Sequence, residues 1–121
     1  MNLCIVEIKV ADMPAGRSFY TEKLGFAVKS EAYLPDVLVL EHEGVDLILH
    51  RADASLALDY PHTAQSLLIF RTPDAEQLAA DLRQKGVEIL EGPRPSPPGI
   101  FLAVRDPFGN VHGFMELANA S

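Results

Sequence analysis

The chain contains very little cysteine, no tryptophan and no long hydrophobic run. Its 121 residues include one cysteine, Cys4, so a disulfide framework within the chain and a multi-cysteine metal site are both excluded. Cys4 stands in an apolar run, where we expect it to pack against other side chains. No segment approaches the roughly 18 consecutive apolar residues of a transmembrane helix, and residues 3–10 have neither the basic leader nor the cleavage site of a signal peptide. We therefore expect a cytoplasmic protein that makes no membrane contact.

Clusters of basic residues are also missing. Seventeen Asp and Glu against ten Lys and Arg give a formal net charge of −7 at pH 7, and the ten cations are dispersed along the chain. Such a chain repels a phosphate backbone, which argues against nucleic acid as a partner. The same charge favours neutral or cationic organic ligands, although an acidic surface also serves solubility alone.

Length and hydrophobic pattern predict one domain made of two similar halves. A chain of 121 residues with 48% hydrophobic residues is long enough for one core and too short for two independent domains. The pattern lapses over residues 52–63 and then restarts, which is typical of a connector. We expect one module at about 1–57 and a second at about 63–121.

The first half predicts the order βαβββ. Val6, Ile8 and Val10 alternate with polar residues, which is the period of a half-buried strand. Asp12 and the following proline begin a helix that ends at Gly25. Three further strands are expected at 26–30, 37–41 and 45–50.

The second half repeats this order. A strand is expected at 67–71, Thr72 is expected to cap a helix, and apolar residues at helical spacing follow until Gly86. Strands are then expected at 87–90, 100–104 and 111–117. The predicted fold class is α+β, with two βαβββ modules that form a cupped mixed sheet, helices on the outer face, and a small-molecule cavity inside.

Two stretches carry a resemblance to a known family. Residues 19–26 (FYTEKLGF) and 106–110 (DPFGN) resemble signature stretches of the vicinal oxygen chelate superfamily, which includes glyoxalase I, bleomycin-resistance proteins and extradiol dioxygenases. The resemblance covers nearly the whole chain and implies the fold described above. Since the two stretches are a helix end and a hairpin turn, they do not identify a reaction.

The resemblance also implies where a metal would bind. Metalloenzymes of the family place His or Glu on the first and last strands of each half. The matching positions in this chain are Ile5, His50, Leu67 and Gly113, of which His50 alone is a ligand type. We therefore expect no cofactor. The fallback is a divalent Zn or Ni ion held by Glu7 and His50, with Glu7 as general base. A one-residue shift of the strand register would add His112 or Glu116 as a third ligand. Without such a shift, we expect His112 in the core.

Alternation along the strands predicts which side chains line the cavity. Gly113 either leaves room for a bulky ligand or marks a strand kink, and Glu7 either binds ligand or pairs with Arg71 or Arg105. Tyr33 and the proline-rich segment 93–99 are expected at the mouth as loops. The predicted ligand-binding residues are Glu7, Tyr33, Ile48, His50, Ile69, Arg71, Phe101, Arg105, Gly113 and Met115.

Three functions remain open at this point. The favoured one is a metal-independent binding protein similar to the bleomycin-resistance branch, which sequesters a drug or metabolite. The alternative is a metal-dependent lyase or isomerase of the lactoylglutathione lyase (glyoxalase I) type with a divergent ligand set. The third is an interaction or sensor domain with a vestigial cavity. A homodimer is expected in each case, because edge strands of a short cupped sheet are protected by pairing with a second copy.

Overall fold

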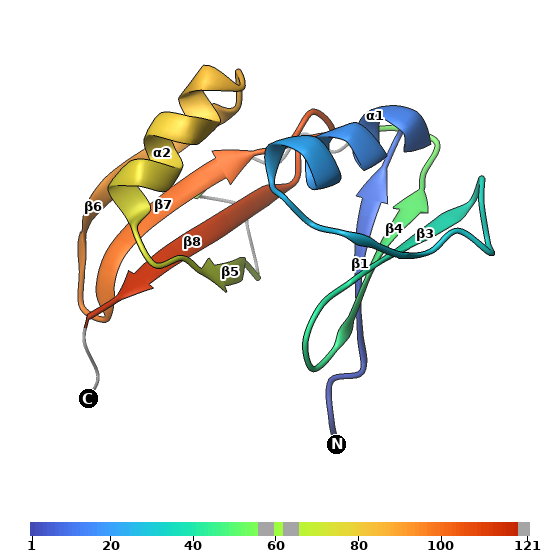
Figure 1. Ribbon diagram of the computed structural model, residues 1–121, viewed down its shortest axis with the longest axis horizontal. Coiled ribbons are helices and arrows are strands. Elements are labelled where there is room, and N and C mark those ends of the chain that lie inside the picture. Colours follow the sequence, from blue (N-terminus) through green and yellow to red (C-terminus); the bar gives the residue numbers. More distant parts are fainter. Residues whose placement is uncertain (56–59, 62–65, 119–121) are drawn as a thin grey trace. The chain divides into compact units, whose positions relative to one another are not determined.

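The chain folds into two compact units, each with its own four-stranded sheet. The computed structural model describes residues 1–55, 60–61 and 66–118. Unit 1 spans Met1–Ala57 and unit 2 spans Leu58–Ser121. Each unit combines helix with mixed sheet in the order βαβββ (Figure 1). The expected α+β class with two βαβββ modules is confirmed.

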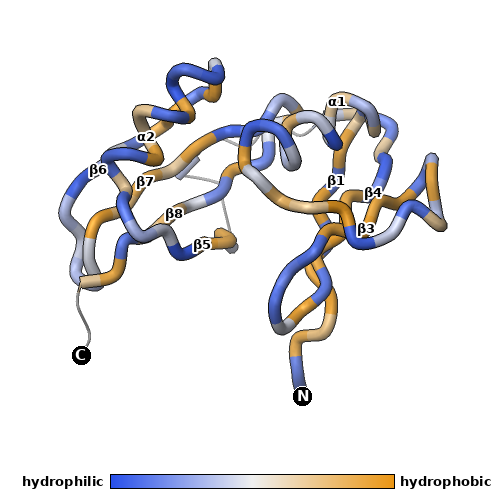
Figure 2. Tube along the Cα trace, viewed as in Figure 1, coloured by the Kyte–Doolittle hydropathy of each residue, from blue (hydrophilic) through white to orange (hydrophobic). Residues whose placement is uncertain are grey.

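Unit 1 has the strand order β1-β4-β3-β2, with β1 parallel to β4 and the other pairs antiparallel. Its hydrophobic core lies between the sheet and the helical segment, and the loop from β3 to β4 is hydrophilic (Figure 2). The elements are β1 Ile5–Val10, α1 Met13–Ser18, a π-helix η1 Phe19–Lys23, β2 Val28–Ser30, β3 Val37–Leu40 and β4 Asp46–Arg51.

The start of α1 follows the sequence prediction. The carboxylate of Asp12 accepts a hydrogen bond from the Ala15 N–H at 2.9 Å, which satisfies one of the free donors of the first turn. The helix passes close to β1 at Gly16, where an added Cβ would lie 3.0 Å from Val10 Cγ1. Its last turns widen into η1, and the chain leaves it at Gly25, whose φ of 86° is in the left-handed region.

Unit 2 has the strand order β5-β8-β7-β6, with β5 parallel to β8. Helix α2 lies across one face of this sheet (Figure 1), and hydrophobic and hydrophilic residues alternate along it (Figure 2). Its apolar stripe, Ala75, Ala79 and Leu82, is buried. The elements are β5 Leu68–Arg71, α2 Ala75–Gln84, β6 Glu88–Ser96, β7 Gly99–Arg105 and β8 Val111–Leu117.

The cap of α2 differs from the prediction. Asp74, rather than Thr72, precedes the helix, and its carboxylate accepts from the Gln77 N–H at 3.0 Å. Thr72 is still tied to the sheet, since its N–H donates to the Met115 carbonyl at 3.0 Å. A residue held by the strand ladder is too early in the chain to cap the helix.

Strand β6 is longer than predicted. Residues 93–96 were expected in a loop, but β6 continues to Ser96 and pairs with β7 up to Gly99. The register shifts twice along β6, between Ile89 and Glu91 and between Glu91 and Arg94. These bulges accommodate prolines that a regular strand excludes, which is why the sequence pattern suggested a loop.

Cys4 is exposed, contrary to the expected packing role, because it precedes the first paired residue of β1 and is flanked by the exposed Leu3 and Ile5. Among the residues that the structure describes, no helix is long and apolar enough to cross a membrane.

Candidate functional site

One face of the unit 1 sheet gathers three of the predicted site residues. The parallel register pairs Glu7 with Ile48 and Lys9 with His50, so these side chains project from neighbouring strands on the same face. Tyr33 lies elsewhere, in the turn before β3, and 65% of it is exposed.

Glu7, Lys9 and His50 form a charged group that we call the Lys9 cluster. Lys9 Nζ lies 2.7 Å from Glu7 Oε2 and 2.9 Å from His50 Nδ1, while His50 Nδ1 lies 3.0 Å from Glu7 Oε1. The hydrogen bond from Lys9, aided by nearby positive charge, lowers the pKa of Glu7 despite some desolvation. Glu7 has its ion-pair partners on its own sheet, and Arg105, one of the two partners weighed for it from the sequence, lies 3.7 Å from Glu88.

The Lys9 cluster does not fit a divalent metal ion as it stands. Glu7 and His50 offer two ligands, whereas a zinc site uses three or four protein groups, and an ammonium already contacts both of them. Of the two fallback third ligands, His112 is buried in unit 2, and Glu116 Oε1 accepts from the Ala75 N–H at 2.8 Å. Across residues 1–55, 60–61 and 66–118, no three His, Cys, Asp or Glu side chains gather as a metal site.

His112 belongs to the core, as expected. Its ring lies 6.0 Å from the ring of Phe70, centroid to centroid, and 3% of the residue is exposed. Burial lowers its pKa to about 4, against a smaller opposing effect of Asp106, so the ring is neutral at pH 7. Glu116 and His112 have the same parity along β8, and both project toward the α2 side of the sheet.

The opposite face of the unit 2 sheet is filled by its own side chains. Phe101, Ala103 and Met115 form a buried cluster there, with Tyr60, Leu67 and Leu90 packed against it. Gly113 lies beneath Phe101, because a Cβ at Gly113 would be 2.7 Å from the Cε1 of that ring. The room that Gly113 was expected to leave for a bulky ligand is occupied by Phe101.

A polar network that the sequence did not reveal covers this cluster. The Tyr60 hydroxyl donates to Glu91 Oε2 at 2.6 Å, Glu91 pairs with Arg94, and the Arg94 guanidinium lies 5.4 Å from the centroid of Phe101. Desolvation and the Glu91 carboxylate raise the pKa of Tyr60 to about 12, and the Tyr60 hydrogen bond lowers the pKa of Glu91.

A bulge at Gly92 builds this network. It has φ 85°, and an added Cβ would lie 2.2 Å from the Phe101 carbonyl oxygen, so only glycine fits. The extra residue in β6 lets Glu91 pair with Ala103 and Arg94 pair with Phe101, which brings both charged side chains to one face. The prolines of this segment concealed the strand, and Tyr60 lay in the part read as a connector.

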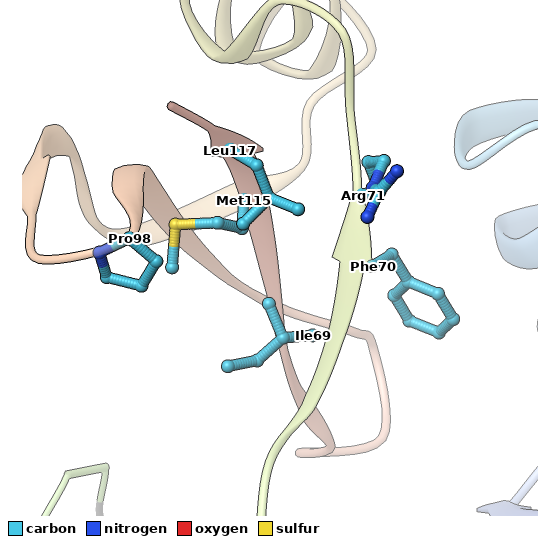
Figure 3. A pocket seen from close by; sticks show the side chains of 6 residues that line it. All are labelled: Ile69, Phe70, Arg71, Pro98, Met115 and Leu117. Carbon is cyan, nitrogen blue, oxygen red and sulfur yellow. The ribbon is translucent and has the colours of Figure 1, made fainter. Parts of the chain in front are cut away.

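The open part of this face lies at β5, an edge strand of the sheet. A pocket of about 390 Å³ is lined by Ile69, Phe70, Arg71, Pro98, Met115 and Leu117 (Figure 3). We call it the edge pocket. Ile69, Met115 and Pro98 group together, while Phe70 projects away from them across β5. Three of its residues, Ile69, Arg71 and Met115, were predicted individually, and Pro98 belongs to the segment 93–99 that was expected at the cavity mouth. Phe70 and Leu117 were not predicted.

Unit 1 has a second apolar pocket of about 350 Å³, lined by Met13, Pro14, Arg17, Leu34 and Pro35. Its only charged member, Arg17, is paired with Glu31. The Lys9 cluster is not part of its lining. The sequence pattern gave no signal for this pocket, because it joins a helix start to an irregular turn.

The comparisons with known proteins agree on one family. The model of the Glyoxalase/Bleomycin resistance protein/Dioxygenase superfamily matches residues 4–114. No curated protein matches the sequence.

Several solved structures share the fold. TnmS3 from Streptomyces sp. CB03234, described as an antibiotic binding protein, is 27% identical, with a TM-score of 0.73 over 98% of this chain and 97% of that one. An integron cassette protein from the mobile metagenome of Halifax Harbour sewage outfall is 25% identical, with a TM-score of 0.76 over 96% and 98%. Lactoylglutathione lyase from Agrobacterium tumefaciens is 16% identical, with a TM-score of 0.71 over 95% and 92%, a likeness of fold alone.

Proposed function

Since the chain belongs to the Glyoxalase/Bleomycin resistance protein/Dioxygenase superfamily, we propose that it is a metal-independent protein that binds and sequesters a small organic molecule, a drug or metabolite. The observation that carries this proposal is the edge pocket of unit 2. Its volume of about 390 Å³ lies within the range of small-molecule sites, and its lining is apolar except for Arg71. The antibiotic-binding description of TnmS3, at 27% identity over nearly the whole chain, supports the same ligand class.

Metal independence is supported by the Lys9 cluster. The ammonium of Lys9 lies between the two side chains that would have to hold an ion, and it already neutralises the Glu7 carboxylate. A divalent cation entering there would be repelled by Lys9 and would find two protein ligands, fewer than the site needs.

The proposal is tested with N-phenyl-1-naphthylamine, a neutral apolar probe whose fluorescence rises on leaving water. We expect saturable binding at one site per chain in EDTA, with affinity unchanged when Zn²⁺ or Ni²⁺ replaces the chelator. Met115→Ala removes a wall of the edge pocket and weakens binding, whereas Met13→Ala, in the other pocket, does not. The absence of saturable binding to the folded protein contradicts the proposal.

The lyase alternative retains one supporting observation, the 3.0 Å contact between Glu7 and His50. It predicts a stoichiometric metal after purification without chelator and a thermal midpoint raised by Zn²⁺, Ni²⁺, Mn²⁺ or Fe²⁺, because a ligand of the folded state stabilises it. It also predicts that His50→Ala abolishes the shift and that the methylglyoxal–glutathione adduct is consumed. We expect none of these results.

We also propose that the chain forms a homodimer. Leu3, just before β1, and Ile5, its first residue, are exposed by 70% and 50%, and β1 ends the strand order of its sheet. Exposed apolar residues beside an unpaired strand edge favour association with a second copy. Sedimentation equilibrium tests this: a dimer is expected, and Ile5→Lys is expected to weaken it.

A further inference from the structure

We infer that the edge pocket selects a ligand with an apolar body and an anionic group, and that Arg71 binds the anion. This inference rests on the proposed function and adds the chemical class of the ligand. Nothing in the overall charge of the chain suggests it, since the net charge of −7 favours cations.

The exposed hydrophobic side chains of unit 2 gather at the edge pocket. Among the described residues of unit 2, the exposed large hydrophobic side chains are Ile69, at 51%, and Leu117, at 40%, and both line the edge pocket. Met115 and Pro98 continue this surface (Figure 3). Apolar surface concentrated in a concave site is what the body of an organic ligand covers.

Arg71 is the charged residue of the edge pocket. It is exposed on β5, and it alone brings charge to the pocket. In the described part of unit 2, no carboxylate pairs with it. A guanidinium binds carboxylate, sulfonate or phosphate groups with two parallel hydrogen bonds, so an unpaired one beside an apolar surface favours an amphipathic anion.

The carboxylates of the same sheet are all engaged by other groups. Glu88 lies 3.7 Å from Arg105, Glu91 binds Tyr60 and Arg94, and Glu116 accepts from the Ala75 N–H. The strands therefore hold three carboxylates with partners of their own and one cation, Arg71, for which the described residues of unit 2 offer no carboxylate. The positive charge of Arg71 acts on a ligand at close range. The repulsion of an anionic ligand by the net charge of the chain is screened beyond about 8 Å at physiological ionic strength.

Two probes that differ by one sulfonate test the inference. The pair is 8-anilinonaphthalene-1-sulfonate and N-phenyl-1-naphthylamine, titrated by fluorescence in 0.15 M NaCl (a physiological ionic strength) with EDTA. We expect the sulfonate probe to bind about tenfold more tightly, the size of one charge-assisted hydrogen-bond pair. Higher salt is expected to reduce this ratio.

Matched variants assign the effect to Arg71. Arg71→Gln is expected to bring the two affinities together, while Arg83→Gln, the same charge change on the exposed side of α2, leaves their ratio unchanged. Arg71→Lys keeps the positive charge but cannot form two parallel hydrogen bonds, and it is expected to give an intermediate ratio of the two affinities. A raised thermal midpoint with each probe shows that the folded state is the one that binds.

The outcomes separate the inference from the proposed function. Equal affinities for both probes in the wild type, or a ratio that Arg71→Gln leaves intact, overturn the inference while binding itself stands. Failure of both probes to bind the folded protein, as when another surface covers the pocket, contradicts the inference and the proposed function together.

Discussion

The ring of Phe101 lies so close above Gly113 that a Cβ at residue 113 would be 2.7 Å from the ring's Cε1. This contact between neighbouring strands closes the centre of the unit 2 face with the chain's own side chain. The position that holds a carboxylate in metalloenzymes of the family, according to the sequence resemblance, therefore has room for one only if Phe101 moves. The open surface is displaced to β5, where the edge pocket lies.

The close approach of Phe101 to Gly113 predicts that one added methyl group lowers the free energy of unfolding. Gly113→Ala forces Phe101 or Ile69 to move, since the new Cβ would be 2.7 Å and 3.1 Å from them, and we expect a loss of about 1–3 kcal/mol of unfolding free energy. Urea denaturation measures it. Phe101→Leu, which shortens the facing side chain, is expected to restore part of the loss in the double variant. Additive losses in the two variants would show that the ring and the glycine are not coupled.

The hydrogen bond between Tyr60 and Glu91, which lies over Phe101, is expected to stabilise the fold. Tyr60→Phe removes the hydroxyl that donates to Glu91, and we expect a loss of about 1–2 kcal/mol in unfolding free energy. Tyr33→Phe, at an exposed turn, is the matched control and is expected to cost little.

The same network predicts an alkaline titration. The Tyr60 pKa is raised to about 12, and the Glu91 carboxylate contributes to the rise. Glu91→Gln is therefore expected to shift tyrosine ionisation, followed by ultraviolet absorbance in a Tyr33→Phe background, to lower pH. An unchanged titration curve would contradict the hydrogen bond between Tyr60 and Glu91.

Much of the fold was predictable because its signals are local. Alternating Val6, Ile8 and Val10, the cap Asp12 and the turn residues 106–110 each act within a few positions, and the corresponding elements form as expected. The family resemblance is confirmed by the match over residues 4–114.

The candidate site was only partly predictable because its contacts are long-range. Alternation placed Ile69, Arg71 and Met115 on one face, but it contains no information about a bulge, so Glu91 and Arg94 were missed. It also gave no measure of side-chain volume, so Phe101 was assigned to an open cavity rather than to the space above Gly113. The Lys9 cluster was missed as a unit because Lys9 and His50 are 41 positions apart in the sequence.

Glu116 predicts a test of the cap of α2. Its carboxylate accepts from the Ala75 N–H at 2.8 Å, which ties β8 to the helix N-terminus where negative charge is favoured. Glu116→Ala is expected to cost about 1 kcal/mol of unfolding free energy, a typical cap value. Glu43→Ala, in an exposed loop, is the control that removes the same charge. Equal effects of the two variants would contradict the capping role.

His112 predicts a pH dependence. Burial holds its folded pKa at about 4, below the ordinary value of 6.5. Between these two pH values His112 is protonated in the unfolded chain and neutral in the folded chain. Its stabilising contribution is therefore complete above pH 6.5 and is lost as pH falls from 6.5 toward 4. Between pH 7.5 and 5.0 we expect His112 to account for a loss of about 2 kcal/mol in unfolding free energy.

Urea denaturation at those two pH values measures this loss. His112→Leu, which keeps an apolar side chain beside Phe70, is expected to flatten the dependence, whereas His42→Gln, at an exposed loop, is expected to leave it unchanged. A dependence that survives in His112→Leu would show that other groups cause it.

We propose above all that the edge pocket binds a small organic molecule without a metal. It is tested most directly by methyl NMR of the Ile-, Leu- and Met-labelled protein titrated with N-phenyl-1-naphthylamine in EDTA. We expect saturable shifts of the methyl signals of Ile69, Met115 and Leu117, with the signals of Ile48 and Met13 unmoved. Shifts confined to Ile48 beside the Lys9 cluster, or shifts that appear only after Zn²⁺ or Ni²⁺ is added, would contradict it.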